Sequence, residues 1–320
     1  MDLTGKKVLV TGGGGFLGGW LGAELASRPV RDVKLLTRAE CDLRSPEATA
    51  ALFETYRPDL VIHAAGLVGG LEFNLDYPAD IFTDGIQMNL NVLASATRAK
   101  VAKVVFLGSS CCYPGDVIGA FKEASLFHGP LHASTEAFGF WKQSMLVGAR
   151  AYEKQYGLRS IFLMLTNLYG PGDDFDEHSS HVVAALVRKF AVAKQNNAAE
   201  VTCWGTGDAV RECLFVRDAA QGVILASERY ESLEPMNMGP GVGTSIKTLA
   251  ETIQRRAGYP GRIVWDTTKP NGAMLKTFDV TRMQRELGWT PPTSLDQGLE
   301  ETMAWVDANY ESVIQARATS

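Results

Sequence analysis

Short apolar runs alternate with longer amphipathic stretches through the first half of the chain. The runs are too short for buried helices and are bounded by glycine or polar residues, which is typical of buried parallel strands. We expect strands at residues 8–10, 33–36, 59–64, 103–107 and 160–165, and helices at residues 20–26, 46–56, 81–100 and 136–156. This alternation predicts an α/β fold with a doubly wound parallel sheet.

In such sheets, ligands bind beyond the carboxyl ends of the strands. The loops that matter therefore open at Thr11, Thr37, Ala64, Gly108 and Thr166. A glycine-rich turn occupies the first of them.

Gly12, Gly15 and Gly18 are spaced as G-x-x-G-x-x-G between the first predicted strand and the first predicted helix. The first glycine permits a tight turn, the second lets the backbone approach a pyrophosphate, and the third lets the helix pack closely. The N–H groups at the helix N-terminus attract phosphate charge. We predict a Rossmann-type dinucleotide site in which Phe16 and Leu17 also contact the cofactor. The alternative is a tight turn without a ligand.

The end of the second predicted strand bears on the choice of cofactor. An NAD site usually ends this strand with a carboxylate that binds the ribose 2′-hydroxyl. Here the strand ends Leu36-Thr37-Arg38, and Arg38 is placed to face a 2′-phosphate, so NADP is favoured over NAD. Asp42 is expected beside the adenine. The alternative for Arg38 is an exposed loop residue without a ligand.

The pattern changes after Tyr169, where a polar, turn-rich stretch precedes the next helix. We expect helices at 181–195, 217–228, 245–257 and 295–308, and strands at 201–204, 236–239 and 262–266. The helix at 217–228 is predicted to return to the first domain, and the other elements to form a smaller mixed α/β lobe. The predicted division is a dinucleotide-binding domain of residues 1–170 and 209–232 and a substrate lobe of residues 171–208 and 233–320.

Composition narrows the class of protein. The chain is 46% hydrophobic, has a formal net charge of −5 and carries no basic stripe, so we expect a large core and no nucleic-acid partner. No apolar run approaches the roughly 18 residues of a membrane-spanning helix, and no apolar leader precedes the first strand. The five cysteines contain no C-x-x-C pair, which favours a reducing cytoplasm, and the cysteines and scattered histidines indicate no metal site.

Candidate catalytic residues follow the fourth predicted strand. Residues 108–114 read GSSCCYP, and Lys142 lies on the next predicted helix. This arrangement resembles short-chain dehydrogenases/reductases, in which the strand supplies a serine and the helix a Y-x-x-x-K motif. There the tyrosine protonates the carbonyl oxygen as hydride arrives, and the lysine binds the nicotinamide ribose and lowers the tyrosine pKa.

Further segments resemble GDP-L-fucose synthases in content and order. They include residues 63–70 (HAAGLVGG), 106–114 (FLGSSCCYP), 166–176 (TNLYGPGDDFD), 180–190 (SHVVAALVRKF), 201–207 (VTCWGTG) and 265–272 (WDTTKPNG). Members of this family make GDP-L-fucose from GDP-4-keto-6-deoxy-mannose by inverting C3 and C5 and then reducing C4 with NADPH. The resemblance implies a nucleotide-sugar substrate, with GDP favoured, and a homodimer formed through the helices at 81–100 and 136–156. The apolar residues of these helices are equally compatible with packing on the sheet.

The resemblance also implies roles for individual residues. Cys111 and His181 are expected as the acid–base pair for C3 and C5, Ser109 as a partner of the C4 oxygen, and Lys142 as a ribose ligand. A thiol and an imidazole suit this task, because the ketone acidifies the C3 and C5 protons and both groups titrate near neutrality. Without the resemblance, we would interpret Cys111 as a small buried apolar residue and His181 as a histidine at the start of a helix.

Other contacts are implied in the same way. The remaining cofactor contacts are expected at Ala64, Leu107, Gly108, Asn167, Leu168 and His181. The substrate contacts are expected at Ser110, Asn167, Lys189, Trp204, Arg211 and Lys276.

One motif departs from the family. Y-x-x-x-K reads Phe138-Gly-Phe-Trp-Lys142 here, and loss of a positioned general acid typically costs about 10²–10⁴-fold in rate. The nearest tyrosines in sequence are Tyr113 and Tyr169. Three hypotheses follow: an epimerase that leaves reduction to another enzyme, a bifunctional epimerase/reductase with another proton donor, and a catalytically quiet subunit that retains the fold.

Two further features remain open. Gly14 and Leu67 stand where the family has basic residues, and the change at Gly14 counts against NADP. Phe140 and Trp141 either reshape the sugar pocket or pack on a helix face.

Overall fold

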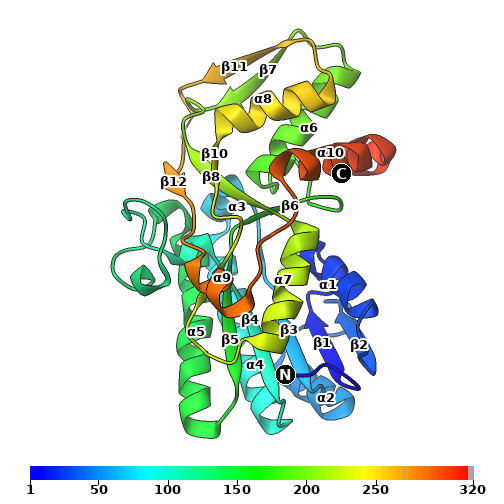
Figure 1. Cartoon of the computed structure of the whole chain (residues 1–320), viewed down its shortest axis with the longest axis vertical. Helices are drawn as coiled ribbons and strands as arrows, with labels where there is room; N and C mark the ends of the chain where they lie inside the picture. Colours follow the sequence, from blue (N-terminus) through cyan, green and yellow to red (C-terminus); the bar gives the residue numbers. More distant parts are fainter. Residues whose placement is uncertain (270, 316–320) are drawn as a thin grey trace.

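The computed structural model describes residues 1–269 and 271–315, and its larger part is built on a six-stranded parallel sheet (Figure 1). The strands are β1 (Lys7–Thr11), β2 (Asp32–Leu36), β3 (Leu60–His63), β4 (Lys103–Ser109), β5 (Ser160–Leu165) and β9 (Met236–Met238). They lie in the order β2-β1-β3-β4-β5-β9, and every neighbouring pair is parallel. The predicted doubly wound sheet is confirmed.

Helices cover both faces of this sheet (Figure 1). Helices α1 (Phe16–Ala26) and α7 (Val216–Arg229) pack together on one face, and α2 (Pro46–Tyr56), α4 (Pro78–Arg98) and α5 (Glu136–Tyr156) form the other layer. Because β2 and β3 flank β1, the direction of winding reverses between β1 and β3, and such switch points are where these sheets bind ligands.

Short helices lie in the connections beyond the carboxyl ends of β3 and β4. They are α3 (Leu71–Asp76), η1 (Ser110–Cys112), η2 (Glu123–Ser125) and η3 (Ala133–Thr135). The last of these leads directly into α5.

A smaller lobe stands above the carboxyl ends of the strands in Figure 1. It contains β6 (Asn167–Tyr169), α6 (Val182–Gln195), β7 (Glu200–Trp204), β8 (Val210–Phe215), β10 (Gly243–Ser245), α8 (Ile246–Ala257), β11 (Arg262–Asp266), β12 (Leu275–Lys276), α10 (Leu295–Ala308) and the π-helix η4 (Glu311–Gln315). Strand β8 pairs with β6, β10 and β12, while β7 pairs with β11. No helix of the described residues is both long and apolar enough to cross a membrane.

Buried side chains form two hydrophobic cores. The first surrounds the main sheet and includes Val10, Ile62, Phe106 and Phe162. The second lies in the smaller lobe, where Phe190 on α6 packs in the same cluster as residues of α8 and α10. The predicted domain boundaries stay a prediction.

The main differences from the expected elements occur at boundaries and in the second half. Helix α1 begins at Phe16 rather than residue 20, and α4 begins at Pro78 rather than residue 81. Strand β8 and helix α9 (Thr281–Leu287) were not predicted, because both carry charged side chains that interrupt the apolar pattern. Residues 236–239 were expected in the smaller lobe, but β9 pairs with β5 at the edge of the main sheet.

The turn after β1 shows why glycine is required at two positions. Gly12 has a φ of +68°, and a Cβ there would lie 2.9 Å from the Ala65 backbone. A Cβ at Gly18 would lie only 2.1 Å from the Gly12 carbonyl oxygen. Close packing of α1 on the turn therefore depends on Gly18.

We expect Gly18→Ala to lower the free energy of unfolding by about 1–3 kcal/mol, because the methyl group overpacks this contact. The matched control is Gly19→Ala in the same helix, where a Cβ meets nothing within 4 Å. That change is expected to be neutral or to stabilise by up to about 1 kcal/mol. Urea unfolding measures both, and equal midpoints for the two variants would contradict this account of the turn.

Candidate functional site

The glycine turn and the N-terminus of α1 form a cradle at the switch point. Gly15 is the N-cap residue of α1, no side chain caps this helix end, and the first turn carries no acidic residue. The backbone N–H groups of the first turn therefore keep their attraction for an anion. Gly12 touches the loop after β3 through Ala65. This geometry fits a pyrophosphate, and Phe16 and Leu17 open the helix at that place.

Arg38 lies on the loop after β2, and its side chain is 69% exposed. Its guanidinium is 3.9 Å from the Asp42 carboxylate, which also pairs with Arg44 at 2.6 Å. Hydrogen bonds from Arg44 lower the pKa of Asp42 to about 2. The same loop places Glu40 at the end of β2. Its carboxylate accepts hydrogen bonds from the Thr37 N–H and from the Thr37 hydroxyl, each at 2.9 Å. The sequence had suggested no carboxylate at this tip.

Lys142 lies inside the main domain at the start of α5. Its ammonium donates to the Leu107 carbonyl oxygen at 2.8 Å and lies 4.2 Å above the Trp141 ring and 5.8 Å from the Phe138 ring. Burial lowers the pKa of Lys142 to about 8. Gly108 and Ser109 follow Leu107 on β4, so this amine reaches the strand that carries the candidate catalytic serine.

The structure provides no substitute tyrosine at the places that the sequence suggested. The Tyr113 hydroxyl donates to the Asn237 side-chain oxygen at 2.6 Å, and the Tyr169 hydroxyl points to the Leu295 carbonyl oxygen at 3.4 Å. Both rings are buried. Neither hydroxyl is placed to replace the one missing from Phe138.

The two aromatic residues between Phe138 and Lys142 have different surroundings. Trp141 is fully buried and packs edge-on against Phe138. Phe140 is 51% exposed and stacks on Phe82 of α4. Trp141 is therefore a core residue beside the lysine, whereas Phe140 belongs to the outer surface.

The Cys111 thiol lies against a positive charge from the smaller lobe. The Lys276 ammonium on β12 is 3.4 Å from the Cys111 sulfur, and the Ser109 hydroxyl accepts a hydrogen bond from the Cys111 N–H at 3.3 Å. Burial alone would raise the pKa of this thiol, but Lys276, Thr135 and Ser109 outweigh burial and lower the pKa below its usual value. The arrangement favours a thiolate, which is the reactive form of cysteine.

His181 and Arg211 lie near the same charges. His181 is the N-cap residue of α6, and burial lowers the pKa of its imidazole; Asp174 opposes this shift and Lys276 adds to it. Arg211 on β8 is the register partner of Lys276 on β12. Its guanidinium donates to the Asn271 carbonyl oxygen at 3.3 Å and interacts electrostatically with Cys111. The thiol and the imidazole therefore both lie within electrostatic reach of one ammonium group.

A second group of predicted residues lies farther out in the smaller lobe. Trp204 is 44% exposed, with the Lys189 ammonium 5.7 Å and the Lys269 ammonium 5.1 Å from its ring centre. A partly exposed aromatic ring with two cations beside it suits a nucleotide base and its phosphates. Lys269 was not predicted, although it lies in the WDTTKPNG segment.

The other predicted contacts lie on β6, after β3 and on η1. Asn167 and Leu168 are on β6, where the Asn167 amide donates to the Glu212 carbonyl oxygen at 2.9 Å. Ala64 follows β3, and Ser110 is buried on η1 beside Cys111.

A small cavity adjoins the thiol. Its lining includes Ser110, Cys111, His132, Thr135 and Lys276. His132 and Thr135 were not predicted, although they precede Phe138 at steps of three residues. In the described residues no group of histidines, cysteines or carboxylates is arranged to hold a metal ion.

Comparisons with known proteins all indicate a family of nucleotide-sugar epimerases and reductases. The profile of the "NAD dependent epimerase/dehydratase family" matches residues 8–239. Probable GDP-L-fucose synthase 1 of Oryza sativa subsp. japonica is 40% identical, over 98% of this chain and 94% of that protein. GDP-L-fucose synthase of Escherichia coli (strain K12) is 37% identical, over 96% and 98%.

Solved structures give the same grouping. A GDP-L-fucose synthetase from Naegleria fowleri bound to NADP has a TM-score of 0.90 and 28% identity, covering 97% of this chain and 96% of that chain. A GDP-6-OMe-4-keto-L-xylo-heptose reductase from C. jejuni has a TM-score of 0.91 and 28% identity, covering 97% and 99%.

We expect Lys276→Met to raise the pKa of the Cys111 thiol, because the ammonium that stabilises the thiolate is lost. Alkylation of Cys111 at neutral pH should slow by roughly an order of magnitude, with its pH profile moved to higher pH. The other four cysteines are buried, so the rate reports on Cys111. Lys269→Met, beside Trp204, is the control and should react like the wild type. An unchanged profile for Lys276→Met would show that this charge does not act on the thiol.

Proposed function

Since the chain belongs to the NAD-dependent epimerase/dehydratase family and, within it, to the GDP-L-fucose synthases, we propose that it inverts C3 and C5 of a GDP-linked 4-keto-6-deoxy hexose. The observation that carries the proposal is the Cys111 sulfur 3.4 Å from the Lys276 ammonium, in a cavity at the carboxyl end of β4. His181 supplies an imidazole within reach of the same charge.

The proposed inversion needs two groups on opposite faces of the sugar ring. The Cys111 thiolate takes the proton from the carbon next to the ketone, and the electron pair of that C–H bond moves to the C4 oxygen as an enolate. The Ser109 hydroxyl donates a hydrogen bond to this oxygen. His181 then delivers a proton to the other face of the carbon, and the ketone re-forms. A lowered pKa makes the protonated His181 ring a stronger acid for this step.

The nucleotide is proposed to lie along the smaller lobe. Trp204 offers its partly exposed ring to the base. Lys189, Lys269 and Arg211 offer positive charge to the diphosphate. This places the sugar toward Lys276 and Cys111, because Arg211 and Lys276 are register partners on β8 and β12.

NADP is the proposed cofactor, and NAD remains the alternative. The turn at Gly12 and Gly15 would hold the pyrophosphate, Arg38 the 2′-phosphate and Lys142 the nicotinamide ribose. When bound, NADPH supplies hydride chemistry at C4 of the sugar. The support in this chain is the uncapped end of α1 and the exposed guanidinium of Arg38.

Reduction of C4 is the second candidate activity. The retained Lys142, buried and directed to β4, favours it, and the absence of a hydroxyl at Phe138 opposes an efficient form of it. The proposal is therefore epimerisation first, with reduction slow unless another group delivers the proton.

A homodimer is proposed through α4 and α5. These helices pack together and leave apolar side chains on their outer surface, including Phe82, Leu90, Phe140 and Val147. A cytoplasmic location stays a prediction, which rests on the five free cysteines.

We expect Cys111→Ser to block the incorporation of solvent deuterium at C3 and C5 of GDP-4-keto-6-deoxy-mannose, because serine is not ionised near neutrality. The loss should be at least about 10²-fold. The control is Cys112→Ser, since burial raises the pKa of Cys112 to about 12 and makes that thiol unreactive. Mass spectrometry in D₂O measures both. Exchange at the wild-type rate in Cys111→Ser would remove this thiol from the mechanism.

We expect Phe138→Tyr to raise the rate of NADPH oxidation with the same sugar by about 10²-fold or more, because it restores a positioned proton donor. Phe140→Tyr, which adds a hydroxyl on the exposed side of the same helix, is the control and should have no effect. An unchanged rate for Phe138→Tyr would indicate that another donor already protonates the C4 oxygen.

A further inference from the structure

A buried asparagine lies at the edge of the main sheet, close to the chain that returns from the smaller lobe. Asn237 is on β9 and is fully buried. Its side-chain oxygen accepts the Tyr113 hydroxyl at 2.6 Å. Its side-chain N–H groups donate to the Phe121 carbonyl oxygen at 2.8 Å and to the Asp279 carbonyl oxygen at 3.1 Å. The oxygen and both donors of this amide are therefore in use.

Tyr113 connects this amide to the segment that carries the thiol. It lies two residues after Cys111 and directly follows η1, and its N–H donates to the Ser110 carbonyl oxygen at 3.3 Å. The Tyr113 ring is buried and stacks on the Phe121 ring, with the ring centres 4.7 Å apart. Because the far end of this ring is bound to Asn237, a shift of η1 would break or strain that hydrogen bond.

Asp279 connects the same amide to the strand that carries the ammonium. It lies three residues after Lys276, which ends β12. The Phe121 carbonyl oxygen that binds Asn237 also accepts the Asp279 N–H at 2.9 Å. The Phe121 N–H donates to the Thr277 carbonyl oxygen at 2.7 Å. The chain directly after Lys276 is therefore tied to the backbone group that Asn237 binds.

These contacts bear on the charge of the thiol, because they act on both ends of one short contact. The Cys111 sulfur is 3.4 Å from the Lys276 ammonium, and Arg211 also interacts electrostatically with Cys111. With an effective dielectric constant of about 20, lengthening the contact by about 1 Å weakens the attraction enough to change the thiolate-to-thiol ratio about fivefold. A small displacement of either segment would therefore be visible in the reactivity of the thiol.

We propose that Asn237 and Tyr113 are positioning residues that hold the Cys111 thiol within hydrogen-bond distance of the Lys276 ammonium. They act on the chemistry through these two groups and not on the sugar. The inference rests on the proposed function for its catalytic meaning, because the thiolate is the proposed base. One buried amide then sets the geometry of a base whose two parts come from different lobes.

Tyr113→Phe tests the proposal, because it removes the hydroxyl and keeps the ring that stacks on Phe121. We expect the pH profile for alkylation of Cys111 to move to higher pH, and the rate below its midpoint to fall about fivefold. The matched control is Tyr259→Phe. Tyr259 is buried in the core of the smaller lobe, and its hydroxyl donates to the Ala198 carbonyl oxygen at 2.9 Å. This control should react like the wild type.

A double-mutant cycle separates positioning from a general loosening of the fold. In Lys276→Met no ammonium remains to be positioned, so adding Tyr113→Phe should change the alkylation rate by less than about twofold. Asn237→Ser is the second variant. Its shorter side chain cannot make the three side-chain bonds, while the backbone N–H can still donate to Glu123 at 3.1 Å. It should act in the same direction as Tyr113→Phe and be equally silent in Lys276→Met.

A wild-type profile in Tyr113→Phe overturns the proposal. An equal shift with and without Lys276 also overturns it, since that result describes a general disturbance around the thiol. Alkylation uses no sugar, so these outcomes do not depend on the proposed function. Failure of the proposed function has a different signature: the wild type incorporates no deuterium, or Cys111→Ser incorporates it normally, while the alkylation profiles still shift.

Discussion

The contact between the Lys276 ammonium and the Cys111 sulfur joins the two parts of the molecule at the point where chemistry is proposed. These residues are 165 positions apart in the sequence and lie on β12 and η1. The charge lowers the pKa of a half-buried thiol, whose pKa burial alone would raise. The nucleophilic character of Cys111 is therefore a property of the assembled fold, because neither the strand β4 nor the smaller lobe supplies it alone.

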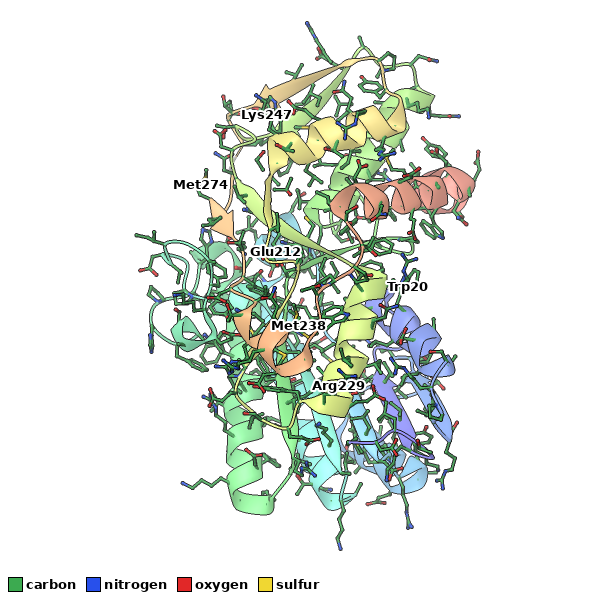
Figure 2. All side chains as sticks on the ribbon, in the orientation of Figure 1. Trp20, Glu212, Arg229, Met238, Lys247 and Met274 are labelled. Atoms are coloured by element: carbon green, nitrogen blue, oxygen red, sulfur yellow. The ribbon has the colours of Figure 1, made fainter. Side chains whose placement is uncertain are left out.

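The position of Lys276 depends in turn on a buried carboxylate. Glu212 on β8 accepts hydrogen bonds from the Gly241 N–H at 2.8 Å and from the Phe278 N–H at 2.6 Å. Figure 2 shows Glu212 where the smaller lobe meets the main sheet. Burial raises the pKa of Glu212 to about 7, so its two backbone donors are needed to hold the charged form. Arg211, which precedes Glu212 on β8, is the register partner of Thr244 on β10 and of Lys276 on β12. Phe278 follows β12 by two residues, so its hydrogen bond to Glu212 helps to hold β12 beside the thiol.

Much of the main domain could be predicted because its signals are local. The helices at 46–56 and 136–156 have the predicted boundaries, and the glycine spacing identifies the turn that contacts Ala65. Strand β8 was missed, since a strand with Arg211 and Glu212 at its centre has no simple apolar pattern and is stable only because both side chains find partners. Long-range contacts were also beyond the sequence. Nothing near Lys276 in the chain indicates that it meets a thiol.

The two halves of the proposed chemistry are held by different contacts. Cys111 depends on η1, η3 and β12, whereas the cofactor side depends on α5, where Phe138 and Trp141 pack around Lys142. Replacement of a tyrosine by phenylalanine leaves this aromatic packing intact and removes only a hydroxyl. The side chain at residue 138 is not among the groups that set the pKa of Cys111, although one of those groups, Thr135, is the N-cap residue of α5. The proposed inversion therefore relies on side chains other than the one at residue 138, which bears only on the proposed reduction.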